Sequence, residues 1–247
     1  MESIYHSAPL SHEHRTIRLL QVHSDKDSSK AVSCDLSVID LDDDHPPFAT
    51  LSYVWNIDTE AKRDIILCGG QALSLTRNGH DALRHLRERL GSFTIWVDAI
   101  CIDQTNHEEK LNQVRLMGSI YSKASIVYVW MGIGKSSSNR ALNFIEHARF
   151  QHYFQWDLES ASIQDRQLEI HKFARAYVFG RLGRIQESSS SAQCAGLTAR
   201  YRYRSDRVLF DDLIALLDNV WLTRMWTYQE ILLASNPILV LGNIHLQ

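Results

Sequence analysis

The chain has 247 residues, of which 45% are apolar and 22% are charged, a composition typical of a globular domain. Its formal net charge of −3 gives no attraction to nucleic acid or to an anionic membrane, so we expect neither as a partner. Four scattered cysteines without a Cys-x-x-Cys pair, the lack of a signal-peptide pattern and the lack of a membrane-length apolar run predict a cytoplasmic protein.

The first third of the sequence alternates apolar segments with turn signals. Residues 16–22 and 31–41 predict two strands joined by a polar turn, and residues 48–55 predict a third strand that is apolar on both faces. Residues 64–75 predict two short strands around Gly69-Gly70, a two-residue hairpin signal. We therefore expect an N-terminal strand pair, a core strand and a β-hairpin.

The middle third alternates helices and strands. Leucines at helical spacing predict a helix between Asn78, the expected N-cap, and the stop signal Gly91. A strand near residues 94–97 and an amphipathic helix over 107–124 follow, and then a buried strand over 125–132. The expected apolar stripe of the second helix consists of Leu111, Val114, Met117, Ile120 and Tyr121. This alternation predicts an α/β fold with a mostly parallel sheet flanked by helices.

The last part of the chain is less regular. Residues 135–207 contain one predicted helix near 139–150 and a serine-rich stretch, which predicts a long, partly flexible insertion. Residues 208–234 predict one or two helices, and 237–242 a final strand. We thus expect a single domain over 1–247 with its core at 16–134 and 208–242. Because an open sheet that finishes on a strand looks interrupted, the sequence also suggests a C-terminal truncation.

The segment TIWVDAICIDQ, residues 94–104, crowds polar side chains against the end of a core strand. Asp98, Cys101, Asp103 and Gln104 fall where ligands bind in doubly wound sheets, at the carboxyl ends of the strands. Two interpretations stay open. The two aspartates cap a turn by accepting hydrogen bonds from backbone amides, or the segment edges a ligand site or a subunit interface.

Four ordered blocks of the sequence resemble the fungal HET domain, named for heterokaryon incompatibility. They are LSYVW (51–55), IWVDAICIDQ (95–104), the segment 108–132, and WLTRMWTYQE (221–230). Asn56, Asp103 and Lys110 depart from the family's usual Gly, Asn and Arg. The resemblance implies a cytoplasmic effector of the programmed cell death that follows fusion of incompatible fungal cells. It also implies a homo-oligomer or a signalling protein partner.

A more distant similarity concerns TIR domains, which have a flavodoxin-like sheet and some of which cleave NAD. Ser52-Tyr53 resembles the end of their first strand, and Trp226 and Glu230 have the spacing of their catalytic helix. The resemblance implies that Glu230 is catalytic and that NAD is a substrate, not a bound cofactor. A carboxylate can stabilise the oxocarbenium-like transition state of nicotinamide–ribose cleavage.

In this hypothesis the remaining site residues bind the substrate. Tyr53, Trp55 and Trp226 shape the pocket, and Arg224 pairs with phosphate. Two alternatives remain: a non-enzymatic, self-associating signalling module and an inactive partial gene product. In both, Trp226 fills the core and Glu230 bonds a backbone amide or Arg224.

Other motifs do not predict chemistry. The stretch GIGKSSS lacks the first glycine of a P-loop, and the twelve histidines form no HExxH or similar metal pattern, so no metal site is expected. Cys101 has no neighbouring base in the sequence, and it is interpreted as a buried thiol.

Overall fold

The computed structural model describes residues 4–11, 14–27, 29–55, 63–147, 212, 216, 219–223, 227–242 and 244–246. The chain divides into two compact units, Met1–Lys135 with Asp218–Gln247, and Ser136–Leu217. In the second unit, helix α4 (Ser136–His147) carries Arg140, which forms a two-pronged ion pair with the buried Asp212 at 3.0 and 2.8 Å. Most of the predicted insertion, from residue 148 on, lies outside the described residues.

A nine-stranded sheet in the order β5-β4-β2-β1-β6-β3-β7-β8-β9 forms the first unit. The strands are β1 (Thr16–Val22), β2 (Ser33–Asp40), β3 (Ala49–Tyr53), β4 (Arg63–Cys68), β5 (Gln71–Thr76), β6 (Phe93–Trp96), β7 (Ile126–Trp130), β8 (Pro237–Leu241) and β9 (Ile244–Leu246). The four strands β6, β3, β7 and β8 run parallel to one another. Their order is that of a flavodoxin-like doubly wound sheet, in which the first strand lies between the second and the third.

The predicted α/β fold with helices around a parallel centre is confirmed, and so are the N-terminal strand pair and the hairpin. β1 pairs antiparallel with both β2 and β6, so the N-terminal pair extends the parallel centre on one side. Gly69 and Gly70 connect β4 to β5 with φ of 57° and 76°, the left-handed conformation that a two-residue hairpin turn requires.

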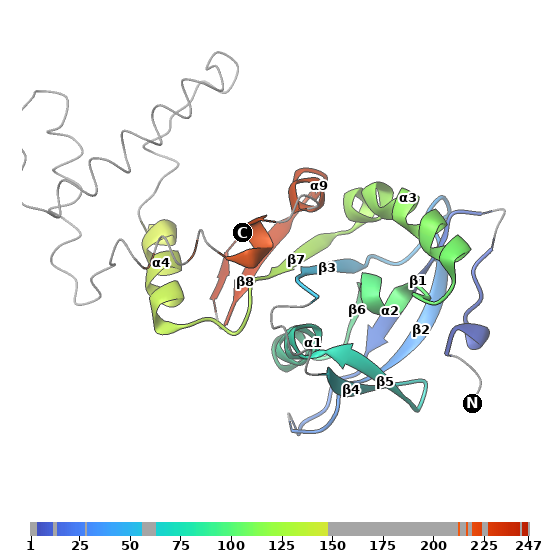
Figure 1. Cartoon of the computed structure of the whole chain (residues 1–247), viewed down its shortest axis with the longest axis horizontal. Coiled ribbons are helices and arrows are strands. Elements are labelled where there is room, and N and C mark those ends of the chain that lie inside the picture. Colours follow the sequence, from blue (N-terminus) through green and yellow to red (C-terminus); the bar gives the residue numbers. More distant parts are fainter. Residues whose placement is uncertain are drawn as a thin grey trace, which may run out of the picture. The chain divides into compact units, whose positions relative to one another are not determined.

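Helices cover both faces of the central strands (Figure 1). They are α1 (Arg77–Leu90), α2 (Asp98–Cys101), α3 (His107–Lys123) and α9 (Thr227–Leu232), with two 3₁₀ turns, η1 (Ile4–Ser7) and η2 (Val220–Thr223). Side chains of β3 show which helix lies on which face. Ser52 contacts residues of η2 and α9, whereas its neighbour Tyr53 packs against α1. Because consecutive strand residues point to opposite faces, α1 and α9 lie on opposite sides of the sheet.

The start of α1 differs from the sequence prediction. Thr76, and not Asn78, is the N-cap, and its hydroxyl accepts a hydrogen bond from the Gly79 amide at 3.4 Å. Asn78 lies in the first turn, and its side chain instead forms hydrogen bonds with Val54, directly after β3, and with Trp130, at the end of β7. The helix ends as predicted at Gly91, which has a φ of 77°.

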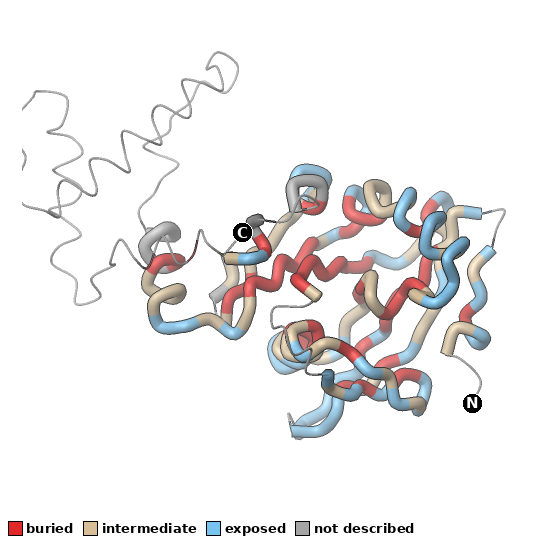
Figure 2. Tube along the Cα trace, viewed as in Figure 1, coloured by how far each residue is buried: buried red, intermediate tan, exposed pale blue. Residues whose placement is uncertain are grey.

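The core runs along the central strands, where all five residues of β3 are buried (Figure 2). The predicted buried stripe of α3 is only half right. Ile120 and Tyr121 are buried, but Leu111 is 62% exposed and Val114 is 39% exposed. In the first half of α3 the buried residue is Gln113, and its side-chain amide donates to Thr16 O at 2.9 Å. None of the described helices has the length and apolar character needed to cross a membrane.

Candidate functional site at the carboxyl edge of the sheet

The carboxyl ends of three parallel strands meet beside β3. Val54 and Trp55 follow β3, Asp98 follows β6 after one residue, and Met131 follows β7. Since β6 and β7 lie on the two sides of β3, the strand order reverses its direction here. Such a switch point is where doubly wound sheets bind their ligands. We therefore take this edge as the candidate site.

Trp55 and the segment 98–104 come together at this edge. Trp55 Nε1 donates to both carboxylate oxygens of Asp98 at 3.0 Å, and the Ala99 amide donates to Asp98 Oδ1 at 2.8 Å. Gln104 Nε2 donates to the backbone oxygen of Asp98 at 3.0 Å. Three predicted site residues thus form one hydrogen-bonded group, and the Asp98 carboxylate holds the indole of Trp55 over the end of β6.

Asn78 joins two of the strand ends, a role that the sequence analysis missed. Its Nδ2 donates to Val54 O at 2.7 Å, and its Oδ1 accepts from Trp130 Nε1 at 2.9 Å. The side chain therefore connects the end of β3 to the end of β7 from the first turn of α1. An asparagine two residues beyond a capping threonine was the only sequence signal.

Tyr53 is buried against α1 and is not open to solvent. It is 2% exposed, and a Cβ added at Gly79 would lie 2.8 Å from Tyr53 Cε2. The absence of a side chain at position 79 therefore makes room for the tyrosine ring. Tyr53 is therefore buried beneath this edge of the sheet, where it packs against α1, and its ring does not line an open pocket.

Glu230 lies on the other face of the sheet. The Ser52 hydroxyl donates to Glu230 Oε2 and accepts from Trp221 Nε1 at 2.7 Å. The exposed fractions are 4% for Glu230, 1% for Ser52 and 0% for Trp221. Because Ser52 and Tyr53 point in opposite directions, the structure does not bring Glu230 and Tyr53 into the single crevice that the sequence hypothesis requires. Arg224 and Trp226 lie outside the described residues, so their predicted roles stay predictions, as does catalysis by Glu230.

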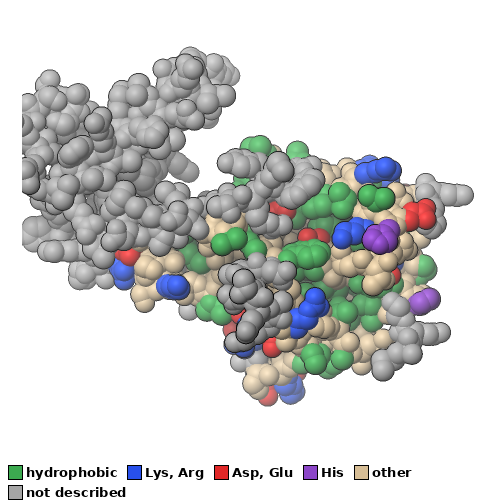
Figure 3. Space-filling model, viewed as in Figure 1, with side chains coloured by type: hydrophobic (Ala, Val, Ile, Leu, Met, Phe, Trp, Pro, Cys, Tyr) green, Lys and Arg blue, Asp and Glu red, His purple; other side chains and the backbone are tan. Residues whose placement is uncertain are grey.

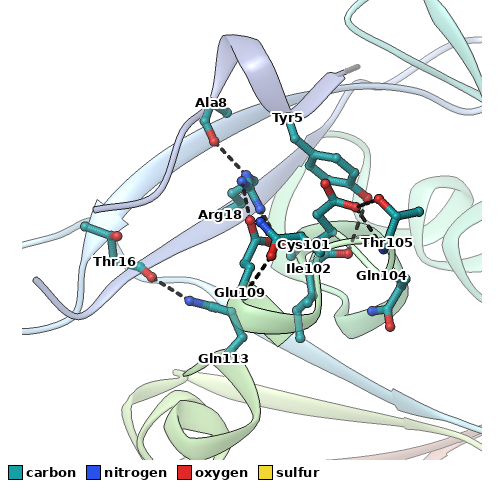
Figure 4. A network of polar contacts seen from close by, with 12 residues as sticks. Tyr5, Ala8, Thr16, Arg18, Cys101, Ile102, Gln104, Thr105, Glu109 and Gln113 are labelled. Carbon is teal, nitrogen blue, oxygen red and sulfur yellow. Dashed lines mark hydrogen bonds and ion pairs between the residues drawn. The ribbon is translucent and has the colours of Figure 1, made fainter. Parts of the chain in front are cut away.

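The rest of the segment 98–104 is held by the N-terminal region and α3 (Figure 4). Arg18 is 2% exposed, and its guanidinium donates to Glu109 Oε1 at 2.6 Å, to Glu109 Oε2 at 3.1 Å and to Cys101 O at 3.1 Å. The Tyr5 ring lies 4.7 Å from the Arg18 guanidinium carbon. This cluster fixes the end of α2 to β1.

Asp103 and Cys101 fit the local interpretation of this segment. Asp103 Oδ1 accepts hydrogen bonds from the Thr105 amide at 3.0 Å and the Thr105 hydroxyl at 2.7 Å, as a turn residue does. Cys101 is fully buried, which raises its pKa to about 12. A thiol with that pKa is not a nucleophile at neutral pH.

In the described part of the chain, no three His, Cys, Asp or Glu side chains lie where they could hold one metal ion. A histidine pair lies on the α1 side of β9. His85 Nε2 and His245 Nε2 are 3.2 Å apart, and the His85 ring packs on Trp130 with centroids 5.3 Å apart. Burial lowers the pKa of both histidines, for His245 to about 4.

Comparisons with known proteins find a family and two relatives that match this chain. A family model described as heterokaryon incompatibility protein (HET) matches residues 48–230, a range that contains β3, the segment 98–104 and Glu230. Heterokaryon incompatibility protein 6, OR allele, of Neurospora crassa is 28% identical over 250 residues, which cover 96% of this chain and 35% of that protein. Vegetative incompatibility protein HET-E-1 of Podospora anserina is 33% identical over 89 residues, 35% of this chain and 6% of that protein.

No solved structure gives a significant match. The chain spans about a third of the length of the Neurospora relative. The family model, in contrast, covers well over half of this chain. The chain therefore belongs to the heterokaryon incompatibility (HET) domain family.

Proposed function

We propose that this chain is a HET-domain effector of heterokaryon-incompatibility-type programmed cell death in the cytoplasm of a filamentous fungus. The observation that carries the proposal is the family match over 48–230, together with two relatives that are named as incompatibility proteins. The free thiols Cys34, Cys68 and Cys101 support a reducing compartment.

Of the two mechanisms that the sequence leaves open, the geometry favours an interaction module. Glu230 is buried and bonded to Ser52, which leaves its carboxylate without access to a substrate in this state. Large apolar side chains, in contrast, are exposed on α3 and at the end of α9, two helices that are in contact. They are Leu111, Val114, Leu232 and Leu233, with exposed fractions of 62%, 39%, 77% and 40%.

These four residues support association with a second copy or a signalling protein. On the face that Figure 3 shows, hydrophobic side chains reach the surface over both helices. Exposed apolar side chains that gather on neighbouring elements are typical of protein interaction surfaces. We call the four residues the α3–α9 surface.

Expression of the chain and its variants in a filamentous fungus tests the proposal. Leu111→Glu and Leu232→Glu are expected to abolish cell death, whereas Leu90→Glu, which alters a 40% exposed leucine on α1, leaves it intact. Folding of each purified variant is checked by its thermal unfolding. Cell death that persists in both surface variants contradicts the interaction module, and absence of cell death with the unmodified chain contradicts the effector role itself.

NAD cleavage is the second candidate, and it rests on the contact between the Glu230 carboxylate and Ser52, whose hydroxyl also accepts from the Trp221 indole. For this reaction the carboxylate has to leave Ser52 and face the nicotinamide ribose, for example after self-association. NAD consumption by the purified chain is compared with that of Glu230→Gln and of the exposed control Glu108→Gln. Turnover that disappears only in Glu230→Gln supports the enzyme, and equal turnover in all three removes Glu230 from the mechanism.

A further inference from the structure

Two cysteines lie directly opposite each other in neighbouring strands. Cys34 of β2 and Cys68 of β4 are register partners in a parallel pair. Backbone hydrogen bonds from Leu67 N to Val32 O at 2.8 Å and from Gly69 N to Cys34 O at 2.9 Å hold the strands together on both sides of the pair. Neighbouring strands lie about 4.8 Å apart, which is within the range of about 4.4–6.8 Å that the Cα atoms of a disulfide span.

The two thiols are free, and both are 1% exposed. They differ in acidity, because a hydrogen bond between them raises the pKa of Cys34 and lowers the pKa of Cys68. Cys34 Sγ also lies 3.4 Å from Leu67 O. Cys68 is therefore the better nucleophile of the two, and Cys34 is the proton donor beside it. The third described cysteine, Cys101, has no thiol partner and stays protonated.

We propose that Cys34 and Cys68 form an oxidation site at which a peroxide closes a cross-strand disulfide. In the first step the Cys68 thiolate attacks one oxygen of hydrogen peroxide, which gives Cys68 sulfenic acid and hydroxide. In the second step the Cys34 sulfur displaces the sulfenic oxygen, which leaves as water with the Cys34 proton. Overall, two thiols are oxidised to one disulfide and one peroxide is reduced to two waters.

A small oxidant can reach this pair because it lies at the end of the hairpin. Cys68 is the last residue of β4, and the exposed turn residues Gly69 and Gly70 follow it directly. Opening of the turn exposes the Cys68 sulfur without unfolding the central strands. The disulfide would then fasten the β4–β5 hairpin to β2 and close a covalent loop that contains β3 with Tyr53 and Trp55.

Peptide mapping of the full chain tests the proposal. The reduced protein is treated with a slight excess of hydrogen peroxide, alkylated in denaturant and digested, and the peptides are identified by mass spectrometry. We expect the Cys34 and Cys68 peptides to be linked, with a loss of two hydrogens, while Cys101 remains alkylated. The melting temperature is expected to rise by about 5 °C or more and to return to its initial value with dithiothreitol.

Two outcomes overturn the proposal. One is that Cys34 and Cys68 both remain alkylated, or are oxidised separately to sulfinic acids, under conditions that oxidise free glutathione. The other is a link that joins either cysteine to Cys194 or Cys101.

In the Cys34→Ala variant, Cys68 sulfenic acid should accumulate and react with dimedone, whereas Cys101→Ala should form the disulfide as the unmodified chain does. If the Cys34→Ala variant does not fold, the mapping of the unmodified chain decides alone.

Discussion

Ser52 and Glu230 are 178 positions apart in the sequence, and the Ser52 hydroxyl donates a hydrogen bond to the Glu230 carboxylate in the interior of the protein. The same hydroxyl accepts the indole proton of Trp221 at 2.7 Å. One small side chain of the central strand therefore satisfies two buried polar groups from the C-terminal part of the chain. This arrangement fastens α9 and η2 to β3.

Replacement of Ser52 by alanine is predicted to destabilise the fold. The variant removes the hydrogen-bond partner that the Glu230 carboxylate and the Trp221 N–H share, and the loss of a partner by a buried polar group costs about 1–3 kcal/mol. Urea unfolding of Ser52→Ala should therefore show a free energy of unfolding about 2–5 kcal/mol below that of the unmodified chain. Ser74→Ala on the exposed side of β5 is the control, and an effect of similar size at both positions would argue against the buried network.

The Arg18–Glu109 pair is predicted to matter far more than the Arg15–Asp42 pair. Arg18 is 2% exposed, and Arg18→Met removes the counter-charge of the Glu109 carboxylate, which keeps the hydrogen bond from the Asp103 amide at 2.7 Å. Removal of one member of a buried ion pair should cost about 3–5 kcal/mol. Arg15 and Asp42 are 40% and 53% exposed, so Arg15→Met should change the free energy of unfolding by less than about 1 kcal/mol. Denaturant unfolding of both variants measures the two losses in the free energy of unfolding. Losses of similar size would show that burial does not determine how much each ion pair contributes.

The histidine pair predicts acid sensitivity between pH 6.5 and about 4. Burial, followed by Arg89 and His85, lowers the pKa of His245 from 6.5 to about 4, so the folded state binds fewer protons than the unfolded state in this window. The stabilising contribution is complete above pH 6.5 and is lost as the pH falls toward 4. Protonation also places two cationic rings next to each other, since the Nε2 atoms are 3.2 Å apart.

Thermal unfolding across this pH range measures the effect. The melting temperature of His245→Gln should fall less steeply with decreasing pH than that of the unmodified chain. His107→Gln, at an exposed position in α3, is the control and should keep the original slope. A His245→Gln profile parallel to the unmodified one would mean that this histidine does not titrate with folding.

Gly79→Ala is predicted to destabilise the protein, although alanine is normally favoured over glycine within a helix by about 1 kcal/mol. The new Cβ would lie 2.8 Å from Tyr53 Cε2, and the buried ring has little room to move. Such overpacking typically costs about 1–3 kcal/mol. Addition of Tyr53→Leu to Gly79→Ala should relieve the clash, so the two substitutions should be less destabilising together than the sum of their single effects. Strict additivity in urea unfolding would contradict the predicted contact.

Local signals in the sequence predicted the fold well. Gly69-Gly70 and the apolar runs around it specify the hairpin, and alternating strands and helices specify the parallel centre. Asp98 and Asp103 both accept hydrogen bonds from nearby backbone amides, although Asp98 also accepts from Trp55, 43 positions earlier. The hairpin, the strand–helix alternation and the amide hydrogen bonds depend on residues that are close in the sequence, and a local sequence pattern can therefore predict them.

The long-range polar contacts could not be predicted in this way. Glu109 lies in the first turn of α3, where acidic residues are common, but its partner is Arg18, 91 positions earlier. The apolar spacing of Leu111 and Val114 predicted that both are core residues. In the structure Gln113 is the buried residue of this part of α3 and donates to β1, whereas Leu111 and Val114 are exposed, and the apolar pattern does not show this contact. Likewise, the spacing of Trp226 and Glu230 predicts a shared helix face, but it does not predict the face of the sheet on which Glu230 lies.

The position of β1 determines how the protein can be shortened. β1 pairs with both β2 and β6, and β8 pairs with β7 on the other side of the parallel centre. A fragment cut to the family-model limits of 48–230 would lose β1, β2 and β8 together. Open backbone edges would then flank the remaining central strands, and open edges promote aggregation. Expression of a soluble domain should therefore retain residues 16–246.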